Sequence, residues 1–182
     1  ANTTASNNVA IGKDALIANT TGNTNIAIGT DALTTNVAGD RNVAVGEGAL
    51  QTLNPSGNVD TLNVAVGYNA GLNVTTGVRN TLIGGLAGDA LTNSVLNTAV
   101  GYQALTAATT ADLNTAIGAN SLSTNILSDR NTAVGTGSLA THNLATNADG
   151  YNTAMGYNAG TAVTSGLANT LIGGLAGDSI TT

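Results

Sequence analysis

Residues 97–105 read Asn-Thr-Ala-Val-Gly-Tyr-Gln-Ala-Leu, and close variants of this phrase recur along the whole chain. Each of the ten copies begins with an asparagine: Asn8, Asn25, Asn42, Asn63, Asn80, Asn97, Asn114, Asn131, Asn152 and Asn169. Seven of the nine intervals between these asparagines are 17 residues long, and the other two are 21 residues long. A fixed period of this length indicates a repeat protein in which each copy forms one structural unit.

The order of the intervals also repeats, because each of the first five asparagines lies 89 residues before its counterpart, as Asn8 and Asn97 do. We divide the chain into a first five-unit super-repeat at residues 1–89 and a second at residues 90–178. Residues 179–182 are the start of a third super-repeat or a truncated end. Because solenoids normally end in capping units and none is recognisable here, we expect the sequence to be a segment of a longer periodic array.

The composition excludes several classes of protein. The 182 residues include 24 glycines, no Cys, Trp or Phe, and only 8% charged residues. The absence of cysteine excludes disulfides and thiolate metal sites. Four cationic residues against ten acidic ones give a net charge of −6, which argues against nucleic-acid binding because phosphate contacts need clustered Lys and Arg. No uninterrupted apolar stretch approaches the ~18 residues of a membrane-spanning helix, so we expect no membrane insertion.

Residue character alternates within each phrase. Counting from the asparagine as offset 0, offsets +1 and +3 carry mostly β-branched residues, such as Val43 and Val45, whereas offsets 0, +2 and +4 carry Asn, Ala or Leu, and Gly. Alternation with a period of two predicts a short strand, and the glycine and β-branched residues disfavour a helix. We expect the branched face to point into the interior and the small face to pack against another backbone.

The fold class that follows is all-β: a β-solenoid, or parallel β-roll, with one coil of about 17 residues per unit and ten coils. At ~4.8 Å between stacked strands, ten coils make a rod of roughly 48 Å, and one super-repeat advances roughly 24 Å. The offset-0 asparagines then lie above one another, where they can form a side-chain ladder. So thin a coil lacks large core side chains, which favours several chains packed side by side in a closed, symmetric oligomer.

The repeated phrase N-[TV]-A-[VI]-G-x-x-A-L resembles the repeats of trimeric left-handed parallel β-rolls in the heads of YadA-like trimeric autotransporter adhesins. The variant at residues 97–105 is similar to repeats of phage tail fibres and related bacterial fibre proteins. The resemblance covers all ten units and implies a parallel homotrimer with an extracellular location, on a virion tail fibre or a bacterial surface. The units here are longer than typical adhesin-head repeats, which often carry Ser in place of this Asn.

From these features we expect the structural shaft of a trimeric fibre that presents a receptor-binding tip, with further copies in longer filaments. One alternative is direct adhesion to a cell-surface receptor, glycan or matrix ligand through the loops of the 21-residue units, near residues 51–61 and 140–150. A third is ice binding, which needs threonines in register. The pairs Thr20-Thr21 and Thr34-Thr35 stand at different offsets and argue against it. We expect no enzyme and no cofactor.

A few residues are candidates for binding a ligand. Tyrosines occupy offset +5 in three units, and the 21-residue units contain the only proline and the only histidine: the candidates are Asn54, Pro55, Ser56, His142, Tyr68, Tyr102 and Tyr157. We expect His142 to be a surface residue. A catalytic histidine needs a nucleophile or carboxylate in fixed relation to it, and neither super-repeat supplies one, so we expect no catalytic residue.

Two carboxylates are weak candidates for a calcium site. Asp112 and Asp129 share offset +15 in adjacent coils, so their side chains are expected to stack about one strand spacing apart. Like charges at that distance repel each other, and either Arg130 or a Ca²⁺ ion could offset the repulsion. A single pair supplies few of the 6–8 oxygen ligands that Ca²⁺ takes. We therefore expect a solvated turn without metal, with calcium as the alternative.

Overall fold

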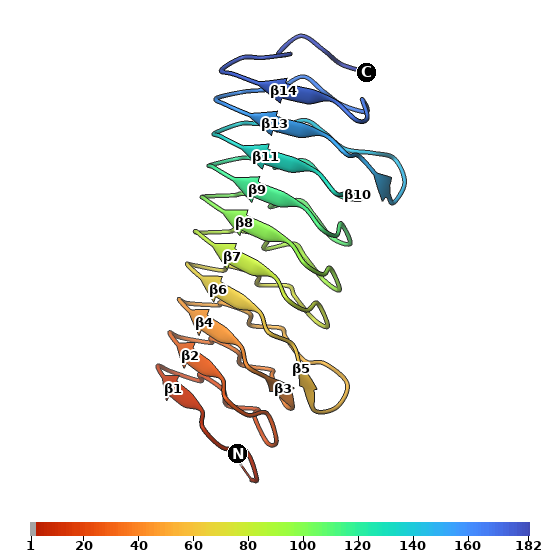
Figure 1. Cartoon of the computed structure of the whole chain (residues 1–182). Coiled ribbons are helices and arrows are strands. Elements are labelled where there is room, and N and C mark those ends of the chain that lie inside the picture. Colours follow the sequence, from red (N-terminus) through yellow and green to blue (C-terminus); the bar gives the residue numbers. More distant parts are fainter. Residues whose placement is uncertain (1–2) are drawn as a thin grey trace.

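Ten short parallel strands form one continuous sheet in the computed structural model, which describes residues 3–182. The strands are β1 (Val9–Ile11), β2 (Ile26–Ile28), β4 (Val43–Val45), β6 (Val64–Val66), β7 (Thr81–Ile83), β8 (Thr98–Val100), β9 (Thr115–Ile117), β11 (Thr132–Val134), β13 (Thr153–Met155) and β14 (Thr170–Ile172). Each occupies offsets +1 to +3 of one phrase, as the alternation predicts. The described residues contain no helix, and successive coils stack into an elongated rod (Figure 1). The predicted parallel β-solenoid of ten coils is confirmed.

The two 21-residue units keep their strands in register with the rest of the sheet. Val43 pairs with Val64 and Thr132 pairs with Thr153, although 21 residues separate the members of each pair. The extra residues form a loop that is closed by two-residue parallel pairs: β3 (Gly39–Asp40) with β5 (Val59–Asp60), and β10 (Ser128–Asp129) with β12 (Ala148–Asp149). Both long loops project from the same side of the rod (Figure 1).

The expected orientation of the strands is wrong. Ala44 and Ala65 at offset +2 are fully buried, whereas the β-branched residues on either side, such as Val43 and Val45, are only half-buried. The branched face therefore points outward. The reason is that the offset-0 asparagine is buried and lies on the same side of the strand as the residue at offset +2, so that the residues at offsets +1 and +3 face the other way.

The buried asparagines form the predicted ladder, largely through side chain-to-backbone bonds. The Oδ1 atom of Asn25 accepts the backbone N–H of Asn42 at 2.9 Å, and Asn80 bonds Asn97 in the same way at 3.0 Å. The Nδ2 group of Asn25 donates to the carbonyl of Gly39 at 2.8 Å. A buried polar group without a partner costs about 1–3 kcal/mol. The ladder therefore allows asparagine to line the core, and it couples each coil to the next.

Leucines at offset +8 fill most of the remaining core, but units four and five carry Gly71 and Gly88 there. Leu82 in β7 stands where most units have alanine, and it explains the two glycines. A Cβ atom added to Gly71 would lie 2.7 Å from Cδ1 of Leu82, and one added to Gly88 would lie 2.7 Å from Cδ2. Leu171 blocks Gly160 and Gly177 in the same way. One strand leucine thus replaces two turn leucines in each super-repeat.

Candidate functional site

The loop of the first 21-residue unit contributes two exposed candidates rather than three. Asn54 and Ser56 are exposed, whereas Pro55 is buried and lies against Gly39, since a Cβ added to Gly39 would be 3.1 Å from Cγ of the proline. The ring of Pro55 therefore does not face solvent as Asn54 and Ser56 do. Its rigid ring packs under the loop and holds the loop against the preceding coil.

His142 is in the core, so its expected surface position is wrong. Its side chain is fully buried, with Nε2 3.0 Å from the Oγ atom of Ser128 and with Nδ1 lacking a hydrogen-bond partner. Burial lowers the pKa of the imidazole below its ordinary value, against a smaller opposite effect of the Thr164 carbonyl. The equivalent residue in the first super-repeat is Leu53, which is also fully buried. That apolar counterpart is the sequence signal that identifies a core position.

The three tyrosines lie in one column directly after the sheet. Tyr68, Tyr102 and Tyr157 are all exposed, and each follows the offset +4 glycine of its coil. The ring of Tyr102 lies beside Gly85 of the preceding coil, because a Cβ added to that glycine would be 3.7 Å from Cδ2 of the ring. The loop candidates precede the strands whereas the tyrosines follow them, so the predicted residues do not form a single site.

The stacked carboxylates are bound to backbone amides. Oδ1 of Asp112 accepts the N–H of Val95 at 2.7 Å, and Oδ1 of Asp129 accepts the N–H of Asp112 at 2.8 Å. Burial raises the pKa of Asp129, and the negative charge of Asp112 acts in the same direction. These side chains therefore connect successive coils. Residues 3–182 contain no group of three or more His, Asp or Glu side chains that could hold a metal ion together.

Arg130 pairs with another carboxylate, Asp149, at the base of the second long loop. The hydroxyl of Tyr151 also donates to Asp149, at 2.7 Å. This hydrogen bond and the guanidinium lower the pKa of Asp149. Arg41 and Asp60 form the equivalent ion pair in the first super-repeat. The two loops thus share an ion-paired base, although their tips differ in sequence.

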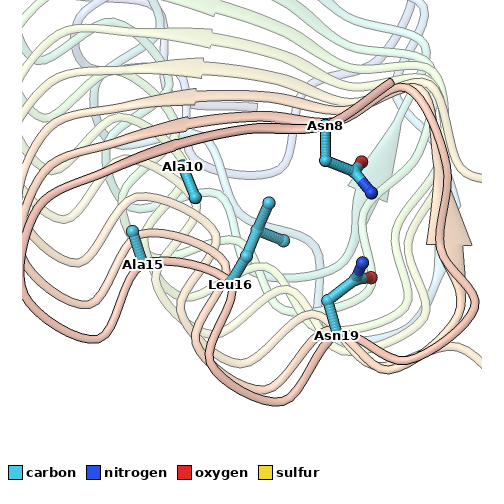
Figure 2. A pocket seen from close by; sticks show the side chains of 5 residues that line it. All are labelled: Asn8, Ala10, Ala15, Leu16 and Asn19. Carbon is cyan, nitrogen blue, oxygen red and sulfur yellow. The ribbon is translucent and has the colours of Figure 1, made fainter. Parts of the chain in front are cut away.

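One cavity of about 150 Å³ lies at the first coil, lined by Asn8, Ala10, Ala15, Leu16 and Asn19. These side chains point toward one another inside the coil (Figure 2). They belong to the same columns that fill the core elsewhere, in which Asn25, Ala27 and Leu33 are the next members. The cavity is therefore the solenoid interior at its first coil and has no chemistry of its own.

The outward face of the sheet is a surface that the sequence prediction missed, because it placed that face inside. Six successive strands, from β7 to β14, present a threonine at offset +1. A threonine at this offset in six consecutive units was visible in the sequence. It was not recognised as a surface feature because the β-branched face of the strands was expected to point into the interior.

Comparisons of this chain with family models, with curated proteins and with solved structures found no match. The class that the fold defines is a parallel β-solenoid with a buried asparagine ladder. In the described part of the chain, no helix has the length and apolar character needed to cross a bilayer.

Proposed function

We propose that this chain is the structural shaft of a trimeric fibre, in a phage tail fibre or a bacterial surface filament or adhesin, and that it carries a receptor-binding tip. The observation that carries the proposal is the uninterrupted ten-strand sheet, in which every coil repeats the register of the one before. Successive coils are joined by hydrogen bonds between backbone groups and by hydrogen bonds from backbone N–H groups to asparagine and aspartate side chains. A rod held together along its axis in this way resists bending, and its length follows from the number of coils.

A ridge of exposed leucines supports association with further copies. Leu62, Leu96 and Leu113 all directly precede an offset-0 asparagine and are 39%, 46% and 40% exposed. The ridge is interrupted by Arg79, which has the same offset between Leu62 and Leu96. The adjacent pair Leu96 and Leu113 is an exposed apolar patch of the kind that another chain covers. Three parallel copies placed around a common axis would bury the same ridge on each chain, as a closed symmetric assembly requires.

Light scattering on the purified chain tests the trimer. We expect a mass near three times the 17.7 kDa of one chain, unchanged by EDTA. Replacing Leu96 and Leu113 by Lys should give monomers with an unchanged circular dichroism spectrum. Ile126→Lys is the matched control, because this isoleucine is similarly exposed but lies outside the column of residues that precede the offset-0 asparagines. A monomeric wild-type chain would contradict the trimer, and dissociation by EDTA would point to a metal at the aspartate pairs.

A further inference from the structure

The outer face of the ten-strand sheet has an unusual chemical composition. Its two side-chain columns, at offsets +1 and +3, contain no charged residue in any of the ten strands. Adjacent strands place equivalent side chains about 4.8 Å apart, and the two columns are roughly 6.6 Å apart along each strand. β-Branched side chains fill almost all of these positions, and branching at Cβ restricts χ1, which limits the motion of such an array.

The lower and upper halves of this face differ in polarity. The first four strands carry Val9, Ile26, Val43 and Val64 at offset +1. The next six carry threonines in register: Thr81, Thr98, Thr115, Thr132, Thr153 and Thr170. Beside this threonine column runs an aliphatic column at offset +3, with Ile83, Ile117 and Ile172 exposed. The upper half is thus an ordered array of hydroxyl and methyl groups.

The hydroxyl groups of these six threonines form no hydrogen bond with any described residue. Several threonines in the turns behave differently, since their hydroxyls donate to carbonyls of the next coil. Thr35 donates to Gln51, and Thr92 donates to Thr109, both at 2.9 Å. Of the turn threonines whose irregular offsets argued against ice binding, Thr20 and Thr35 therefore serve to join coils. The sheet threonines remain available to water, and they are in register.

We propose that the threonine-bearing half of the sheet, from β7 to β14, orders water in an ice-like array and binds ice. A spacing of about 4.8 Å by roughly 6.6 Å is close to the repeat distances of water molecules on the prism plane of ice. The hydroxyls can replace lattice water, while the neighbouring methyl groups favour caged water around them. The absence of charge leaves nothing to impose a competing hydration pattern. This activity goes beyond the shaft function and uses a surface distinct from the leucine ridge.

Thermal hysteresis of the purified chain, measured with a nanolitre osmometer, tests the proposal, together with inhibition of ice recrystallisation. We expect a gap between melting and freezing temperatures in the wild type. Thr115→Leu combined with Thr132→Leu should remove most of it, because leucine lacks the hydroxyl and protrudes further. The isosteric Thr115→Val should cause a partial loss. Val64→Thr should increase the gap, because it extends the row by one strand.

Thr136→Leu is the matched control, since Thr136 is exposed just beyond the strand, and it should leave the hysteresis unchanged. Circular dichroism checks that each variant keeps its fold. The proposal is overturned if wild type shows no more hysteresis than serum albumin at equal molar concentration, or if the double variant retains full activity. It is equally overturned if the double variant changes the mass in light scattering, because another copy would then cover this face. That result is independent of the Leu96 and Leu113 test.

Discussion

The two super-repeats build the same five coils from sequences that differ in position-dependent ways. Four of the five offset +1 residues change between them, from valine or isoleucine in the first to threonine in the second, as at Val43 and Thr132. These residues point outward. The buried asparagine, alanine and glycine columns persist in both copies. The difference shows that the inner columns specify the coil, whereas the outer face is free to acquire a surface property.

The interiors of the super-repeats are alike at one position and unlike at another. Leu82 and Leu171 fill the space above two glycines with almost the same contacts in both copies. At the 21-residue units, by contrast, Leu53 is replaced by His142 and Gly39 is replaced by Ser128, whose hydroxyl lies 3.0 Å from the imidazole. The second copy therefore has a polar pair where the first copy has a leucine side chain and a glycine.

The largest effect is expected at Leu82. Replacing Leu82 by Ala leaves a cavity above both glycines, and core Leu→Ala substitutions cost about 2–5 kcal/mol of unfolding free energy. Leu171→Ala should cost less, because Leu171 is only partly buried. Urea unfolding gives the total loss, and hydrogen exchange of residues 71–91 and 160–180 shows where the loss falls.

The repair variant sharpens this test. Adding Gly71→Leu and Gly88→Leu to Leu82→Ala converts units four and five to the pattern of their neighbours, so most of the lost stability should return. Leucine is tolerated at this left-handed position in other units, for example at Leu50 with a φ of 50°. If Leu82→Ala is fully tolerated alone, or if the triple variant is less stable than the single one, the proposed exchange of one strand leucine for two turn leucines is wrong.

A smaller effect is expected from acid, and only in the second super-repeat. Because burial lowers the pKa of His142 in the folded chain, the unfolded chain takes up a proton first as pH falls below about 6.5. The free energy of unfolding should therefore fall as the pH drops from about 6.5 to the folded-state pKa of His142. Above about pH 6.5, this histidine should make no pH-dependent contribution to stability. The pKa of His142 is affected by burial and by the backbone of Thr164, and not by a carboxylate that could compensate the charge of a protonated imidazole.

Exchanging the two equivalent residues isolates this effect. His142→Leu should remove the histidine-dependent loss between pH 7.5 and 5.0, and Leu53→His should introduce a loss in the first super-repeat. Urea midpoints as a function of pH measure the effect, and the difference between each variant and the wild type isolates the contribution of the histidine. An unchanged pH profile in His142→Leu would show that the imidazole is not what limits acid stability.

The sequence predicted the strands, their parallel stacking and the asparagine ladder. All three follow from the fixed spacing of the repeats and from the alternation of residue character with a period of two residues. It did not predict which face is inside. Val43 and Ala44 are both apolar, and only the buried hydrogen bonds of Asn42 with its neighbours decide between them. His142 was misplaced because a loop insertion does not reveal which of its residues stay in the core. The equivalence of His142 to Leu53 was the better guide, because a leucine at the same position of the first super-repeat indicates a core position.

The smallest effect is expected at the bases of the two long loops. Arg41 and Arg130 pair with Asp60 and Asp149 at exposed positions, and exposed ion pairs contribute little to global stability. The loops should nevertheless respond differently to removal of the arginine. Arg130→Ala leaves Asp149 bonded to the hydroxyl of Tyr151, whereas Leu62 occupies the equivalent position in the first super-repeat and cannot donate. Limited proteolysis should therefore cut residues 54–60 faster in Arg41→Ala than residues 143–149 in Arg130→Ala. Adding Tyr151→Leu to Arg130→Ala should bring the second loop toward the rate of the first, and equal rates without that addition would show that the tyrosine does not hold the loop.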